Sequence, residues 1–168
     1  MDTATAALID PERQLLGCLL QLPTGPARRV LAEMHANDLA DPEAAHVLGL
    51  AIEVLARDQD PAPVVLYTHA VTTGQAPGRT RREALAQWLF DTYRDAPPAA
   101  LAEHLKAAVL EAAWRRALTA HADRLRQAAD TAPTDLLREL ADDTGAIDDL
   151  WRRYRAAAEP TTRLEVAA

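Results

Sequence analysis

The region from residue 97 to residue 157 places the strongest constraint on the fold of this chain. Pro97 and Pro98 open it, and no proline or glycine follows until after Asp130. Proline is tolerated in the first turn of a helix and disfavoured further in. We therefore expect a helix that starts at the two prolines and runs to Asp130, roughly 50 Å long at about 1.5 Å per residue.

A second helix follows this first one after a short break. Residues 131–133 include Pro133, and a helical pattern resumes at about Thr134. Leu140, Ile147 and Tyr154 then recur every seven residues, which is typical of helices that pack in a coiled-coil manner. The pattern predicts a long antiparallel helical hairpin over residues 97–157.

The first helix of this hairpin carries two apolar stripes, of which a single partner helix can cover only one. The second stripe requires either the rest of the chain or a second copy of the protein, and periodicity leaves both open. Our candidate oligomer interface draws on both helices and consists of Leu110, Trp114, Leu118, Leu125, Leu136, Leu140, Ile147, Trp151 and Tyr154.

Residues 10–94 predict a compact bundle of about five short helices. Aspartate, proline and glutamate stand in order at Asp10 and again at Asp41, a pattern that favours helix starts. Thr80 and Glu83 match a capping box. The expected helices span residues 11–21, 27–35, 42–57, 64–71 and 80–92. The predicted fold class is all-α, with residues 1–9 disordered and residues 158–168 a tail or linker.

Two small residues in the first helix indicate how it packs. Gly17 lies in mid-helix, where glycine is about 1 kcal/mol less favourable than alanine, so we expect another helix to approach closely there. Cys18 is the single cysteine of the chain, on a leucine-rich face. It cannot form an internal disulfide, and a buried thiol is the favoured interpretation.

The composition disfavours a general affinity for nucleic acid. The formal net charge is −7, the chain has one lysine, and its arginine pairs are interrupted by acids. Nonspecific binding to phosphate backbones depends on neutralisation by lysine and arginine, so we interpret these arginines as solvated or as intersubunit ion pairs. No apolar run is long enough for a membrane span. The N-terminus lacks a signal-peptide pattern, and we expect a cytoplasmic protein.

The residue patterns that would indicate an enzyme are missing from the sequence. It has no P-loop and no Gly-x-Ser-x-Gly, and its five histidines lack metal-ligand spacing. The acidic pairs at 142–143 and 148–149 fit a solvated helix face. We therefore predict no catalytic residues, no cofactor and no metal.

Residues 12–20 read Glu-Arg-Gln-Leu-Leu-Gly-Cys-Leu-Leu. They match throughout the signature Glu-x-x-Leu-Leu-Gly-x-Leu-Leu that opens the N-terminal domain of the DnaB family of replicative helicases, and residues 10–130 resemble that domain. Later matches include His46, Ile52, the Ala96-Pro97-Pro98 entry to the hairpin, and Arg115-Arg116-Ala117-Leu118. The residues that we assign to the family signature and core are Glu12, Leu15, Leu16, Gly17, Leu19, Leu20, His46 and Ile52.

The resemblance implies a non-catalytic module that self-associates through its hairpin. In the family these domains form dimers that assemble into a hexameric collar, a trimer of dimers, and the collar also receives primase. The present chain departs from the family at Leu39, which replaces an aromatic residue, and it lacks the RecA-like motor that hydrolyses ATP. We expect self-association, with primase or a replicative helicase as further partners.

Two other functions compete with this hypothesis. A DNA-binding regulator built on a helical dimer would bind DNA in a salt-sensitive manner, which the net charge argues against. A small enzyme would need a site near His46 or His104, and no acid, base and nucleophile converge there in the sequence pattern.

Overall fold

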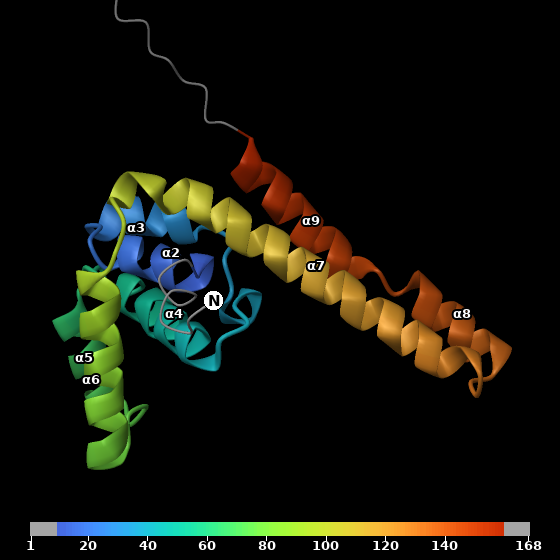
Figure 1. Ribbon diagram of the computed structural model, residues 1–168, viewed down its shortest axis with the longest axis horizontal. Coiled ribbons are helices and arrows are strands. Elements are labelled where there is room, and N and C mark those ends of the chain that lie inside the picture. The colour runs from blue at the N-terminus through green and yellow to red at the C-terminus, as the bar shows by residue number, and fades with distance from the viewer. Residues whose placement is uncertain (1–9, 160–168) are drawn as a thin grey trace, which may run out of the picture. The chain divides into compact units, whose positions relative to one another are not determined.

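The computed structural model describes residues 10–159 (Figure 1). Helices and the turns between them make up this part of the chain, without a strand, which confirms the all-α class. The predicted disordered N-terminus lies outside the described residues, as does most of the predicted tail. The chain divides into two compact units, one up to Val109 and one from Leu110 onward. We call them the bundle unit and the hairpin unit.

The bundle unit consists of short helices around a leucine-rich core (Figure 1). Helix α2 packs against α4 and α6, and α5 also contacts both of these helices. Helices α2, α4, α5 and α6 each place fully buried leucines in one core cluster. The helices of this unit are α2 (Pro11–Leu19), α3 (Thr24–Leu31), η1 (Ala36–Asp38), α4 (Pro42–Leu55), α5 (Pro63–Thr72), α6 (Gly78–Arg94), η2 (Ala99–Leu101) and the start of α7 (Ala102–Ala129).

The two predicted aspartate caps are present in the structure. The Asp10 carboxylate accepts a hydrogen bond from the Glu12 amide at 3.1 Å, at the start of α2. Asp41 accepts from the amides of Glu43 and Ala44 at 3.1 and 3.4 Å, at the start of α4. Each cap satisfies backbone donors that have no partner inside the helix, so these two helix starts follow from local sequence.

Helix α3 begins earlier than its sequence pattern predicts. The predicted start was residue 27, whereas the helix begins at Thr24. Asp60, which is distant in sequence, accepts from both the Thr24 amide at 2.7 Å and the Thr24 hydroxyl at 2.6 Å. This cap comes from tertiary structure, and a local reading of the sequence therefore misses it.

Helix α6 also begins earlier than the sequence pattern predicts. It begins at Gly78, with Thr80 already inside the helix, so the predicted capping box at Thr80 is wrong. Glu83 instead pairs with Arg79 at 2.6 Å, one turn away on the exposed side of the helix. The helix predicted over residues 64–71 is present as α5.

The expected close approach at Gly17 is present, and it involves the end of α6. A methyl group added at Gly17 would lie 2.8 Å from the Ala96 Cβ and 2.9 Å from the Thr92 carbonyl oxygen. The neighbouring Cys18 is buried, as predicted, with its Sγ 3.5 Å from the Pro98 carbonyl oxygen. Burial raises the pKa of this thiol, which keeps it protonated and unreactive.

The hairpin unit contains the rest of α7 together with α8 (Thr134–Asp142) and α9 (Gly145–Ala158). Within it, α8 and α9 run back along α7 (Figure 1). The predicted second helix is broken between α8 and α9, at Asp143 and Thr144, and the backbone leaves the helical conformation at Asp143. Two adjacent aspartates followed by Thr144 and Gly145 form a weak stretch for a helix, and the Thr144 hydroxyl donates to Asp148 at 2.8 Å.

The first helix of the hairpin, α7, begins later than predicted. The chain is extended at Pro98, a short 3₁₀ turn follows, and α7 starts at Ala102. A proline disfavours the helical conformation in the residue before it, so the Pro97-Pro98 pair delays the helix start. Helix α7 has 28 residues in all, which correspond to about 42 Å.

Candidate protein-docking surface

An aromatic cluster lies on the hairpin unit where α7 and α9 meet. The ring centroids of Trp114 and Trp151 are 4.9 Å apart, and those of Trp151 and Tyr154 are 5.4 Å apart. The Arg155 guanidinium lies over the Trp151 ring, 5.9 Å from its centroid. Tilted ring pairs at this spacing are favourable beyond the area that they bury, so the cluster fixes the register between α7 and α9.

The nine residues of the predicted interface differ in exposure. Leu110 and Ile147 are buried within the chain and do not belong to its exposed surface. Leu118, Leu136 and Trp151 are exposed by 44%, 54% and 41%. The remaining members are half-buried, namely Trp114, Leu125, Leu140 and Tyr154.

We define the hairpin face as the exposed and half-buried apolar residues around the aromatic cluster, Trp114, Leu118, Trp151 and Tyr154. Leu118 lies one helical turn after Trp114 on α7. Together these residues offer large amphipathic rings, of the kind that dominate the energetics of protein interfaces. The hairpin face is therefore suited to binding another protein.

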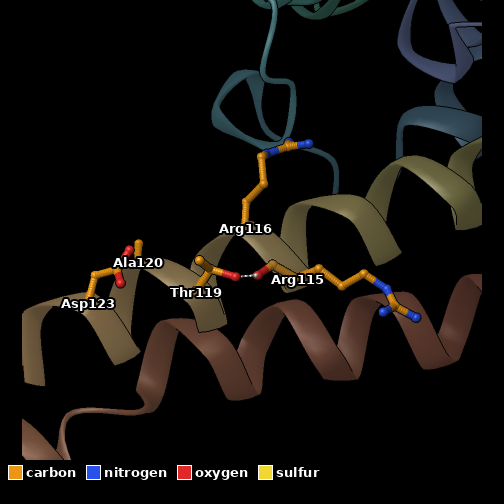
Figure 2. A pocket seen from close by; sticks show the side chains of 5 residues that line it. All are labelled: Arg115, Arg116, Thr119, Ala120 and Asp123. Atoms are coloured by element: carbon orange, nitrogen blue, oxygen red, sulfur yellow. Dashed lines mark hydrogen bonds between the residues drawn. The ribbon is translucent and has the colours of Figure 1, made fainter. Parts of the chain in front are cut away.

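A polar hollow of about 380 Å³ also lies on α7, lined by Arg115, Arg116, Thr119, Ala120 and Asp123 (Figure 2). Arg115 pairs with Glu111 through two nitrogens, at 2.6 and 3.0 Å, and Asp123 pairs with Arg126 at 2.7 Å. The Thr119 hydroxyl donates to the Arg115 carbonyl oxygen at 3.0 Å. Figure 2 shows the two arginines leaving the helix in different directions. These groups do not converge on a common point.

The bundle unit carries an apolar groove between α5 and α6 that the sequence analysis missed. It has a volume of about 380 Å³ and is lined by Pro63, Val64, Tyr67, Ala86, Leu89, Phe90 and Tyr93. Val64 and Phe90 are 70% and 59% exposed. The available signal was the spacing of Phe90 and Tyr93, which places both on one side of α6 and away from the buried Leu85.

The matched signature residues have structural roles in the bundle unit. Both Glu12 carboxylate oxygens accept from the Ala40 amide at 2.8 Å, and one accepts from the Asp41 amide at 3.0 Å. Glu12 is buried, so it holds the segment before α4 against α2. The signature leucines are core residues, namely Leu15, Leu16, Leu19 and Leu20.

A hydrogen-bond network around the buried His69 is the second feature that sequence reasoning missed. His69 contacts Glu53 at 2.5 Å and Arg57 at 3.0 Å, and it is 5% exposed. Gln75 donates to the same Glu53 oxygen at 2.9 Å. The spacing of these residues matches no motif, because three segments of the chain contribute them.

His46 and His104, the residues considered for an enzymatic site, lie on different helices, α4 and α7. His46 is half-buried, and its Nε2 has no hydrogen-bond partner among the described residues; His104 is exposed. Ile52, expected on the buried side of α4, is 38% exposed.

In residues 10–159, no group of three or more metal-binding side chains comes together. None of the helices described is both long and apolar enough to span a membrane.

Comparison with known proteins does not assign the chain to a family. No protein-family model matches it, and no curated protein matches it.

Proposed function

We propose that this protein is a non-catalytic module that associates with itself through its hairpin and docks other proteins. The observation that carries the proposal is the hairpin face. Trp151 is 41% exposed beside Trp114, and Leu118 is 44% exposed one turn further along α7. A helical bundle followed by a two-helix hairpin is the arrangement assumed in this proposal.

The ion pairs of the hairpin unit favour protein binding over DNA binding. Arg115 pairs with Glu111 at 2.6 Å, and Asp149 pairs with both Arg152 and Arg153 at 2.8 Å. Arginines neutralised in this way release fewer counterions from a phosphate backbone. The acidic net charge of −7 acts in the same direction.

The partners in this proposal come from the sequence resemblance to the DnaB helicase N-terminal domain. We propose a dimer, or a hexamer built as a trimer of dimers, that acts in DNA replication in the cytoplasm through contacts with primase or a replicative helicase. The match of residues 12–20 to the family signature supports this assignment. The chain itself would hydrolyse no ATP.

The particle mass in solution tests self-association. Light scattering across a concentration range should give a dimer or a larger assembly for the full chain. Trp151→Asp should weaken the assembly by about 30- to 1000-fold, the range for loss of an aromatic interface anchor. A strictly monomeric wild-type chain would refute self-association.

Phe90→Asp provides a matched control for this experiment. Phe90 is also an exposed aromatic residue, but it lies in the groove of the bundle unit. The Phe90→Asp variant should have the same particle mass as the wild type if the hairpin face is the interface. If Phe90→Asp abolishes the assembly and Trp151→Asp retains it, the interface lies on the bundle unit.

Co-sedimentation with purified primase and with a replicative helicase tests the partners separately. We expect one of the two to bind the wild-type chain at micromolar concentration or below. If neither binds while self-association persists, the module is an assembly domain and its place in replication is wrong.

A further inference from the structure

Helices α5 and α6 lie side by side in the bundle unit (Figure 1). The start of α5 and the end of α6 line the same apolar groove of about 380 Å³, so the two helices run antiparallel there. Leu89 is buried and forms the floor of the groove, whereas Val64 of α5 and Phe90 of α6 are mostly exposed. All of the lining residues are uncharged, so the groove suits an apolar ligand.

Aromatic side chains form much of the groove wall. Tyr67 comes from α5, and Phe90 and Tyr93 come from α6. Tyr93 is 48% exposed and Tyr67 is half-buried. Within residues 10–159 neither tyrosine hydroxyl has a hydrogen-bond partner, and the Tyr67 hydroxyl is not closed off from solvent. Each helix therefore offers a ligand one ring with a hydroxyl that is free to donate.

These hydroxyls distinguish between the kinds of chain that could occupy an apolar groove. An α-helix satisfies its own backbone hydrogen bonds except at its ends, so a docked helix would leave both hydroxyls unused. A β-strand would need an exposed sheet edge, and the described part of the chain contains no strand. A polyproline II segment has no internal hydrogen bonds, so its carbonyl oxygens are free to accept. Aromatic-lined grooves are also the surfaces that recognise such segments.

The length of the groove fits about one turn of polyproline II. Ala86 and Tyr93 mark its extent along α6 and are seven positions apart, which corresponds to about 10 Å at about 1.5 Å per residue. A polyproline II helix rises about 3.1 Å per residue and has about three residues per turn. A segment of about three or four residues therefore spans the groove.

The groove edge at the end of α6 has an excess of negative charge. Arg94 lies over the Phe90 ring, 5.7 Å from its centroid. Its guanidinium pairs with Asp95 at 2.8 Å and with Asp91 at 2.9 Å, so two carboxylates share one cation. Arg13 of α2 also attracts Asp95, but it does not line the groove. A basic residue beside the prolines of a ligand would complement this edge.

We propose that the groove between α5 and α6 binds a proline-rich segment of a partner protein, with prolines against the aromatic rings and a basic residue beside Asp95. Carbonyl oxygens of that segment accept hydrogen bonds from the hydroxyls of Tyr67 and Tyr93. This surface belongs to the bundle unit and is additional to the hairpin face. It goes beyond the self-association proposed above and does not rest on it.

Fluorescence anisotropy with the full chain tests this binding. The probe is a labelled peptide of about nine prolines followed by one arginine, which forms about three turns of polyproline II. It should bind in the micromolar range, as expected for a small transient interface. A helical leucine–lysine peptide of the same length should bind at least about 10-fold more weakly, because it leaves both hydroxyls unused.

Variants of the groove assign the binding to its parts. Phe90→Asp should weaken peptide binding by at least about 30-fold, as for loss of an aromatic anchor. Tyr93→Phe keeps the ring and removes only the hydroxyl, which should weaken binding by about 3- to 10-fold. Asp95→Asn should weaken binding by about 2- to 5-fold, and only for the peptide that carries arginine. Trp151→Asp, on the hairpin face, should bind the peptide as the wild type does.

Circular dichroism checks that each variant retains its helices. Failure of the proline peptide to bind the wild type would overturn the proposal, and so would equal affinity for Phe90→Asp and the wild type. Tighter binding of the helical peptide, or unchanged affinity in both Tyr67→Phe and Tyr93→Phe, would also overturn it. The particle mass reports self-association separately, so failure of one proposal is distinguishable from failure of the other.

Discussion

Leu48 in α4 and Leu136 in α8 are both helical leucines, yet the first is fully buried and the second is 54% exposed. The difference extends to the two units. Of the 28 buried apolar residues among the described positions, 25 belong to the core cluster of the bundle unit. The hairpin unit contributes Leu110, Ala113 and Ile147.

The comparison shows what a helix needs in order to bury an apolar face. A helix in the bundle unit has several neighbours, so its apolar residues are enclosed from more than one side. In a two-helix hairpin each helix has one neighbour, and only one stripe is covered. The apolar residues that remain are available for a partner, and this is why the docking proposal rests on the hairpin unit.

Truncating the two leucines gives the largest contrast between the units. Leu48→Ala should lower the free energy of unfolding by about 2–5 kcal/mol, because it leaves a cavity in a closed core. Leu136→Ala should lower it by no more than about 0.5 kcal/mol, the usual range at exposed positions. Urea denaturation at low protein concentration measures both. Equal effects would mean that the exposed leucine is covered in solution.

Two helical glycines provide a smaller and sharper test of packing in the bundle unit. Gly17→Ala places a Cβ 2.8 Å from Ala96 and should destabilise the fold by about 1–3 kcal/mol, and Gly17→Leu by more. Gly49→Ala has open space around it and should stabilise α4 by up to about 1 kcal/mol. Thermal unfolding distinguishes them. A melting temperature that does not fall in Gly17→Ala would contradict the close approach at Thr92 and Ala96.

Glu12→Gln tests the charged hydrogen bonds that hold the segment before α4. The variant keeps the size of the side chain but loses the charge that two amides donate to, which should cost about 1–3 kcal/mol. Glu83→Gln removes the charge from an exposed glutamate and should change the stability by less than about 1 kcal/mol. Chemical denaturation of the two variants side by side compares them, and equal losses would rule out a special role for Glu12.

Acidification should weaken both units through one carboxylate in each. Hydrogen bonds from Thr24 lower the pKa of Asp60, and those from Arg152 and then Arg153 lower the pKa of Asp149. A carboxyl with a lower pKa in the folded state stabilises the fold above its unfolded pKa, and this contribution is lost as the pH falls through the folded value. Stability should therefore decrease below about pH 4.

Asparagine substitutions show which carboxylate causes the loss of stability at low pH in each unit. Asp60→Asn should flatten the pH dependence of amide exchange in α3, and Asp149→Asn that in α9. Hydrogen exchange followed by mass spectrometry between about pH 6 and pH 3 measures it, after correction for the intrinsic rate. An unchanged profile in α3 of Asp60→Asn would show that the Thr24 contact contributes little.

The sequence predicted those features that depend on local chemistry. The aspartate caps of α2 and α4, the close approach at Gly17 and the burial of Cys18 follow from neighbouring residues and helix geometry. The start of α3 depends on Asp60, which lies 36 residues away, and local patterns do not contain this information. The break before α9 escaped the heptad reading because Leu140, Ile147 and Tyr154 keep their spacing across it.

The sequence predicted which apolar residues line the hairpin helices, but it did not predict which of them are exposed. Periodicity placed Trp114, Leu118 and Trp151 on the apolar side of the hairpin helices, where the structure exposes part of each ring or chain. The same periodicity included Ile147, which the structure buries. A heptad pattern identifies apolar positions, but which of them remain at the surface depends on the number of neighbouring helices. The His69 network was beyond sequence reasoning, because its four residues come together only in the folded chain.

Helix α8 has a practical consequence for experiments on this protein. Its nine residues bury no side chain, and the turn that precedes it, at residues 131–133, is mostly exposed. Exposed turns of small and polar residues accept insertions with little loss of stability. A fluorescent dye or an affinity peptide can therefore be introduced at this turn, which would allow the distance between two copies to be measured in the assembly that we propose.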